Sequence, residues 1–182
     1  MNTPLTTTEP QVSSNLTFST PSHQSLSKFL LFDVEKLHLA LSVDLVQKVI
    51  NYTPVFGSGL SSFGVAHIDN QEITVIDLHQ QFFKTSSEIA VGRGVQAPEF
   101  DSGDSPSQKG YLILTKTTIG ETFALWVTQA PTLIDVSLSQ IRLLPESYRR
   151  ADTLGSASHV MLIPSENKTM TVFILDVDHL IT

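Results

Sequence analysis

Hydrophobic and polar residues alternate in short runs along most of the chain, and the runs come in pairs. The apolar-rich stretches 28–34 and 37–43 are separated only by Glu35 and Lys36. Two such runs on either side of a short polar break predict a β-hairpin. The same plan recurs in three more places: 63–68 with 72–76, 111–116 with 122–127, and 160–163 with 170–175. The pattern therefore predicts a chain built mainly from hairpins.

Helical signals are few and short. Single strands are predicted at 48–52 and 132–136, and short helical stretches at 44–47, 78–83, 137–141 and 176–181. The first of these stretches has Ser42 or Asp44 as its candidate cap, and the third begins at Ser137 and is ended by Pro145. Many short strands between Gly- and Pro-marked turns indicate small closed or half-open β-barrels.

The chain also carries an internal repeat. The runs at 29–32 and 39–43 are echoed at 111–114 and 123–127, and Val75-Ile76-Asp77-Leu78-His79 is answered by residues 174–179. In each ending the apolar run stops at an Asp, which can accept a hydrogen bond from the free N–H groups of a first helical turn. A repeat of about 80–100 residues is too long for a solenoid, whose period is about 20–50. We therefore expect two similar β units, with a groove between them that suits a partner.

Two segments depart from this pattern. Residues 1–27 are rich in Ser, Thr, Pro, Asn and Gln, a composition that cannot bury enough apolar surface to offset its ordering entropy, so a disordered tail is predicted. Residues 85–109 hold several Gly and Pro with acidic residues between them, which predicts a flexible linker between the two halves.

Composition excludes several classes of function. The chain has 182 residues, 41% hydrophobic and 16% charged, with a net charge of -7, against about 25% charged in an average protein. This describes a globular chain with few charges, and nothing in it attracts nucleic acid. There is no cysteine, which removes disulfides, thiol catalysis and Cys-based zinc sites. No stretch resembles a signal peptide or a membrane span, so we expect a cytoplasmic protein without direct membrane insertion.

Candidate catalytic and metal sites are scarce. None of the six histidines has the spacing of a metal site, and the matched positions of His79 and His179 favour a structural role. Gly92-Arg93-Gly94 lies in the predicted linker, without the strand and helix that a phosphate site needs. Asp176 and Asp178 are explained by helix capping and a solvated first turn, although a site there stays open. Trp126 is either a core residue or a recognition aromatic. We expect no enzyme activity, no metal and no cofactor.

Four stretches, taken in order, resemble the CheW-like domain of bacterial chemotaxis systems. Residues 28–34 and 39–49 resemble the opening hairpin of that family and the segment after it. Residues 63–68 and 73–78 resemble its central "GVxNLRGxxxPVxDL" stretch. Residues 124–127, 134–141 and Pro145 resemble the start of its second barrel, and 172–181 its closing strand and helix. The resemblance covers residues 28–182 apart from the linker, which is longer than usual in the family.

The resemblance implies an all-β fold of two interlocked, five-stranded, SH3-like barrels with a few short helices. The first barrel would span 28–84, with a C-terminal strand able to exchange with the other barrel, and the second 110–182. It also implies a non-enzymatic adaptor that couples the cytoplasmic tip of a methyl-accepting chemoreceptor to the regulatory domain of a CheA-type histidine kinase. Such an adaptor would act in chemotaxis, phototaxis or twitching motility, in the cytoplasm or recruited to membrane receptor arrays.

This chain departs from the family at two charged positions. The family usually has Arg-Gly where this chain has Asp69-Asn70, and an acid where this chain has Lys48. Those family positions tend to pair, so Lys48 and Asp69 are expected to form the same ion pair with its polarity exchanged. The alternative is two unrelated surface substitutions. The candidate partner-binding residues are Val46, Gln47, Lys48, Asp69, Val127 and Ala130, although core packing explains each of the three apolar ones at least as well.

A second class of function stays open. A pair of small barrels could enclose a small ligand and serve as a sensory module. A large closed pocket inside a barrel would favour that alternative, whereas packed interiors would favour the adaptor.

Overall fold

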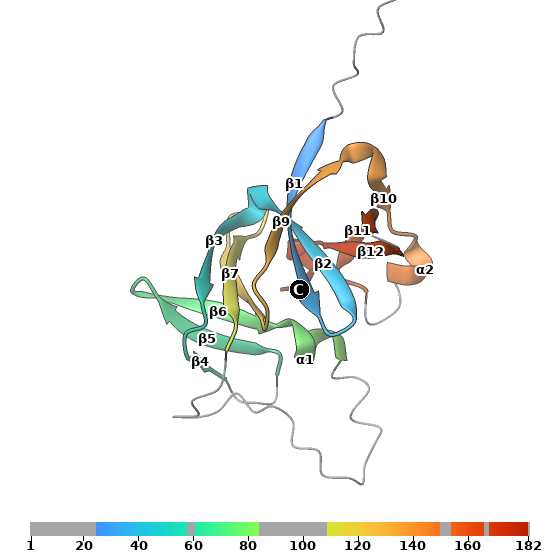
Figure 1. The fold of residues 1–182 in the computed structure, drawn as a ribbon. Coiled ribbons are helices and arrows are strands. Elements are labelled where there is room, and N and C mark those ends of the chain that lie inside the picture. The colour runs from blue at the N-terminus through green and yellow to red at the C-terminus, as the bar shows by residue number, and fades with distance from the viewer. Residues whose placement is uncertain (1–24, 58–60, 84–108, 150–153, 166–167, 182) are drawn as a thin grey trace, which may run out of the picture.

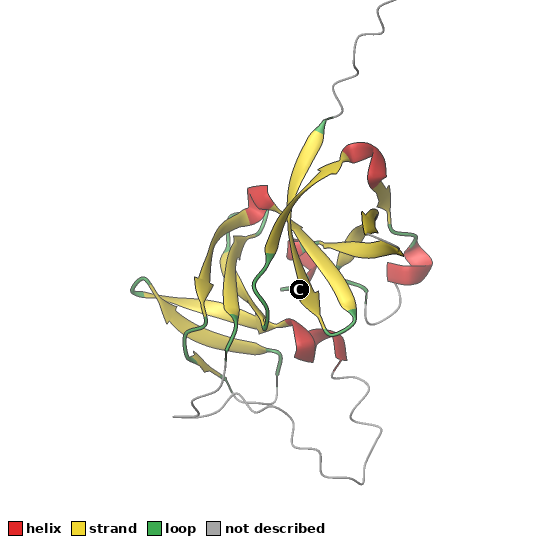
Figure 2. Ribbon diagram, in the orientation of Figure 1, coloured by secondary structure: helices red, strands yellow, loops and turns green. Residues whose placement is uncertain are grey.

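The computed structural model describes residues 25–57, 61–83, 109–149, 154–165 and 168–181, and most of them are strands. The strands are β1 (Leu26–Val34), β2 (Leu37–Ser42), β3 (Val46–Asn51), β4 (Val55–Phe56), β5 (Phe63–Ile68), β6 (Gln71–Asp77), β7 (Tyr111–Lys116), β8 (Thr122–Val127), β9 (Thr132–Ser137), β10 (Ile141–Leu143), β11 (Ala157–Ser165) and β12 (Lys168–Leu175). The helices α1 (Leu78–Phe83) and α2 (Glu146–Arg149) are short (Figure 2). The predicted all-β class is confirmed.

The strands form two six-stranded sheets. Sheet A has the order β10-β11-β12-β2-β1-β9, and sheet B the order β3-β7-β8-β6-β5-β4. Sheet B, with green β5 and β6, lies on one side of the molecule, and sheet A, with orange and red β10 to β12, lies on the other (Figure 1). Neighbouring strands are antiparallel except at β2–β12 and β6–β8, which are parallel. Each sheet has six strands where the resemblance implied five.

Each half of the chain gives its first hairpin to the sheet of the other half. Hairpin β1–β2 joins β9 to β12 in sheet A, whereas hairpin β7–β8 joins β3 to β6 in sheet B. The second half therefore repeats the first strand by strand, with β7 to β12 in the places of β1 to β6. The barrels do not follow the boundaries 28–84 and 110–182, because the exchanged element is an N-terminal hairpin and not a C-terminal strand.

The exchange creates three packed regions. The interior of sheet B is filled by residues such as Ile68, Val75 and Leu112, and that of sheet A by Phe29, Met161 and Val172. Between the sheets, the two exchanged hairpins pack against each other through residues that include Leu41 and Leu125, both 0% exposed. We call this third region the central core.

The matched Asp residues behave as the sequence predicted. The Asp77 carboxylate accepts a hydrogen bond from the backbone N–H of Gln80 in α1 at 3.1 Å. The Asp176 carboxylate accepts one from the N–H of Asp178 at 3.2 Å. Both close the first turn after a strand, although the second turn is a 3-10 turn (Val177–His179) instead of the predicted longer helix.

Several local expectations were wrong. The turn predicted at 44–47 is a 3-10 turn at Val43–Leu45 without a side-chain cap bond from Ser42, and β3 begins at Val46. Strand β1 begins at Leu26, inside the predicted tail, because Leu26 and Ser27 already pair with β9.

The capping role of Ser137 is confirmed, for the 3-10 turn Leu138–Gln140. Residues 1–24 and 84–108, which hold the rest of the tail, nearly all of the linker and Gly92-Arg93-Gly94, lie outside the described residues.

Candidate docking surface

The ion pair expected from the sequence is present. Lys48 projects from β3, and its Nζ contacts the Oδ2 of Asp69 in the turn between β5 and β6. Asp69 and Asn70 both have positive φ angles, 51° and 63°, which is the conformation of a tight hairpin turn. The pair therefore joins β3, at one end of the sheet order, to the tip of the β5–β6 hairpin. Both side chains remain accessible, with exposed fractions of 39% for Lys48 and 74% for Asp69.

An irregularity in β3 directs side chains of this segment toward solvent. The pairing of β3 with β7 shifts register between Val46, opposite Thr115, and Lys48, opposite Leu114. Gln47 is thus the extra residue of a β-bulge, a feature that redirects side chains. Its Nε2 donates a hydrogen bond to Thr122 Oγ1 at 3.2 Å, while Val46 is half-buried against the central core. Gln47, Lys48 and Asp69 form an accessible polar surface next to this strand.

Val127 and Ala130 do not join that surface. Val127 is 2% exposed and belongs to the central core, so its side chain is not available to a partner. Val127 is paired with Tyr111, whereas Val46 is paired with Thr115. Tyr111 and Thr115 lie at opposite ends of β7, roughly 13 Å apart at the usual strand rise of about 3.3 Å per residue. Ala130 is exposed beyond Val127, just before β9.

A hollow at the junction of the sheets is lined by four titratable side chains. It has a volume of about 350 Å³, and its lining includes Asp33, Glu35, Asp77 and His79. Each of these groups already has a structural partner. Asp33 contacts His38 Nδ1 at 2.7 Å, Glu35 contacts His79 Nε2 at 2.6 Å, and Asp77 caps α1. Burial raises the pKa of the Asp77 carboxyl above its ordinary value, against the opposing effect of its hydrogen bonds with Gln80 and the charge of His79.

The matched histidines and Trp126 are also explained by packing and pairing. His79 contacts Glu35, and His179 Nδ1 lies 3.0 Å from Asp176. The half-buried Trp126 ring packs on Tyr52, with 6.0 Å between ring centroids. Within the described residues, no group of three His, Asp or Glu side chains is placed to hold a metal ion. None of the helices described here has the length and hydropathy to cross a bilayer.

A family model for the CheW-like domain matches residues 28–182. The chain belongs to the CheW-like family. Among solved structures, it is similar to the scaffolding protein TtCheW from Thermoanaerobacter tengcongensis, with 15% sequence identity and a TM-score of 0.58 over 86% of this chain and 88% of that one. This likeness shows that the two proteins share the CheW-like fold, as the resemblance predicted. No curated protein sequence matches the chain.

The sequence missed one surface. Phe56, Phe63 and Val65 on the outer face of sheet B are exposed by 66%, 39% and 41%. In β5, residues 63–68 are apolar or small at nearly every position, so alternation could not tell the outer face from the inner one. Phe56 lies between the predicted strands 48–52 and 63–68, where the sequence predicted no strand.

Proposed function

We propose that this protein is a non-enzymatic adaptor that couples the cytoplasmic tip of a methyl-accepting chemoreceptor to the regulatory domain of a CheA-type histidine kinase. It would act in the cytoplasm, in chemotaxis, phototaxis or twitching motility. Membership of the CheW-like family supports this role. The packed sheet interiors support it too, because they leave the outer surface as the place for binding.

The observation that carries the proposal is the Lys48–Asp69 pair. It lies at an exposed position where the family usually has the opposite order of charges. An exposed ion pair adds only about 0–1 kcal/mol to stability. Its charges instead select partners, because reversed charges repel a partner built for the usual order. The adaptor should therefore discriminate against a receptor and kinase that match the usual polarity.

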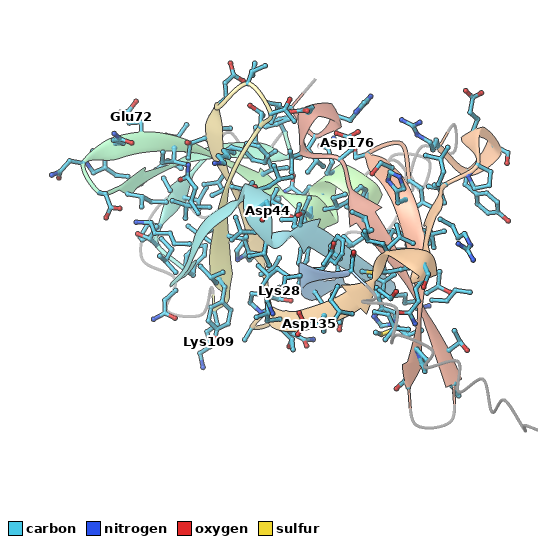
Figure 3. The ribbon with its side chains drawn as sticks, turned by 90° about the horizontal axis from the view of Figure 1, so that it is seen from above. Lys28, Asp44, Glu72, Lys109, Asp135 and Asp176 are labelled. Carbon is cyan, nitrogen blue, oxygen red and sulfur yellow. The ribbon has the colours of Figure 1, made fainter. Side chains whose placement is uncertain are left out.

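Binding to such an ordinary receptor–kinase set tests this discrimination. The double variant Lys48→Glu, Asp69→Arg restores the usual polarity and keeps an ion pair, so it should bind the set at least tenfold more tightly than wild type in a pull-down titration. The matched control exchanges Lys28 and Asp135, an exposed pair in sheet A with a 2.7 Å contact, whose side chains lie together in Figure 3. That exchange should leave binding unchanged. Equal binding by wild type and the Lys48→Glu, Asp69→Arg variant would rule the discrimination out.

Co-purification from the native host tests the adaptor role itself. We expect a CheA-type kinase and a chemoreceptor to accompany the tagged full-length protein, and the kinase to be lost when the Lys48–Asp69 polarity is reversed. Recovery of neither protein, at expression levels where the adaptor is abundant, would contradict the proposed coupling.

A further inference from the structure

The outer face of sheet B carries an apolar patch formed by Phe56, Phe63 and Val65. Phe56 lies directly opposite Val65 in the β4–β5 ladder, and Phe63 lies two residues before Val65, on the same face of β5. Their neighbours Val55, Gly64 and Ala66 point inward and are buried. A solvated sheet face normally carries polar side chains, so this outer patch is exposed apolar surface of the kind that marks partner sites.

The outer patch continues into a groove. One hollow is lined by Phe63, Thr74, Glu121, Thr122, Phe123 and Ile181. A second hollow shares Glu121 and Ile181 with the first and reaches Ile119, which is 81% exposed in the β7–β8 turn. The surface therefore runs from β4, across β5, β6 and β8, to the segment after β12. We call this surface the sheet B groove.

The charge of the groove is negative. Of the residues that line the two hollows, the charged ones are Glu121 and Asp178. Hydrogen bonds from Thr118 lower the pKa of the Asp178 carboxyl, and the carboxylate is negatively charged at neutral pH. Glu72 adds an acid at the tip of the β5–β6 hairpin (Figure 3), and the base nearest to the hollows in the β7–β8 ladder is Lys116, opposite Thr122. Apolar residues beside acids complement a partner with an apolar stripe and basic flanks.

Sheet A shows that the fold does not require this patch. The cross-strand row Phe56–Val65–Thr74 of sheet B has Arg142–Val160–Phe173 as its equivalent in sheet A. The most exposed apolar member of the patch, Phe56, is thus replaced by a charged residue at the same place in the same topology. Folding alone therefore does not explain an aromatic side chain at position 56.

We propose that the sheet B groove docks an amphipathic α-helix of a partner protein. Apolar side chains at positions i, i+3 or i+4, and i+7 of the helix would pack on Phe56, Phe63 and Val65. Lys or Arg side chains beside that stripe would face Glu121 and Asp178. The proposal rests on the groove itself and names neither the receptor nor the kinase, so its failure would leave the proposed function untouched.

The probe is a fluorescein-labelled helical peptide of roughly 18 residues, about five turns, with a Leu stripe flanked by Lys and Arg. We expect the full-length protein to bind it in a fluorescence anisotropy titration. Phe56→Ser and Val65→Thr should each weaken binding at least tenfold. The matched controls are Leu143→Ser and Leu162→Ser, which remove side chains of sheet A that are 67% and 53% exposed and should leave binding unchanged.

A charge reversal tests the complementarity independently of the apolar residues. Glu121→Lys should weaken the basic peptide about tenfold and strengthen a peptide with the same Leu stripe flanked by Glu. Three results would overturn the proposal. The first is absence of peptide binding, and the second is equal binding of the basic and the acidic peptide by wild type. The third is a loss of peptide affinity in the sheet A controls that equals the loss in the sheet B variants. Sedimentation of the protein alone provides a further check: a dimer that Phe56→Ser abolishes would make a second copy of the chain the occupant and overturn the helix.

Discussion

Sheets A and B have the same topology, and one inner row is almost the same in both, whereas an outer row differs. Where the exchanged hairpin meets its host sheet, the inner row is Val75–Ala124–Leu114 in sheet B and Ile174–Ala40–Leu31 in sheet A. In both, an Ala lies between a β-branched residue and a Leu. On the outer face, exposed Phe56 corresponds to Arg142. Packing restricts this inner row because close-packed interiors tolerate few changes of volume, whereas the outer position is free to specialise for binding.

The largest expected effect tests the symmetry of the central core. Leu41 and Leu125 occupy equivalent places in the two exchanged hairpins, and both are fully buried. Leu41→Ala and Leu125→Ala should each lower the free energy of unfolding by about 2–5 kcal/mol, through lost burial and the cavity left behind. Urea unfolding of each variant measures this. A loss below about 1 kcal/mol for one variant only would show that the two hairpins do not contribute alike.

A smaller loss of stability is expected when a glycine of sheet B is replaced by alanine, and almost none for the same change next to sheet A. A Cβ on Gly64 of sheet B would lie 2.5 Å from Val55 Cγ1 and 3.1 Å from the Phe56 carbonyl oxygen. Gly64→Ala should therefore cost about 1–3 kcal/mol from overpacking. Gly155, before β11 of sheet A, is the matched control because its Cβ would meet nothing closer than the Arg149 carbonyl oxygen at 3.4 Å. Gly155→Ala should change the urea midpoint little, and equal losses at both positions would contradict the crowding of β4 on β5.

Asp77 and Asp178, in the segments where β6 and β12 end, should give pH dependences of opposite sign. Burial raises the pKa of Asp77, so its contribution to stability is complete below the unfolded value of about 3.9 and is lost as pH rises through the folded pKa. Hydrogen bonds lower the pKa of Asp178, so its contribution is present above about pH 3.9 and is lost as pH falls through the folded pKa.

Two amide variants measure this difference. From about pH 2.5 to about pH 7, the stability of Asp77→Asn relative to wild type should rise, and that of Asp178→Asn should fall. Urea unfolding across that range gives both slopes, with wild type as the reference at each pH. Parallel slopes for the two variants would show that burial and hydrogen bonding do not differ between the sites in this way.

The smallest effect compares the two exposed ion pairs. Double-mutant cycles on Lys48–Asp69 in sheet B and Lys28–Asp135 in sheet A should each give a coupling of about 0–1 kcal/mol, reduced at high salt. A coupling well above this for Lys48–Asp69 alone would mean that the pair stabilises the fold, which would weaken its assignment as a determinant of partner choice.

The hairpins were predictable from sequence, but their exchange was not. Each hairpin has its own alternation and turn residues, such as Asp69-Asn70, and these act over a few neighbouring positions. The exchange depends on which sheet receives β1–β2. Because the two halves repeat the same pattern, the sequence alone does not show which of the two sheets the apolar face of that hairpin packs into.

The candidate site was predicted in part. Lys48 and Asp69 could be paired through the family resemblance, because both departures lie at positions that pair in the family. Val127 was assigned to the same surface as part of the matching edge of the second barrel, but matching positions of the repeat lie in different sheets and are not brought together. Phe56 escaped prediction because a strand of two residues leaves too short a pattern to detect.

The hairpin exchange constrains how the chain can be made. Strands β1 and β2 leave the ribosome before their neighbours β9 and β12, which come from the second half of the chain. Until that half has been translated, the first hairpin has no sheet to join. Its apolar side chains are then exposed to solvent or bound by a chaperone. Contacts between such distant segments also slow folding. A truncation before β12 should therefore leave the N-terminal hairpin without its parallel neighbour, and this protein should be far less tolerant of C-terminal shortening than two consecutive domains would be.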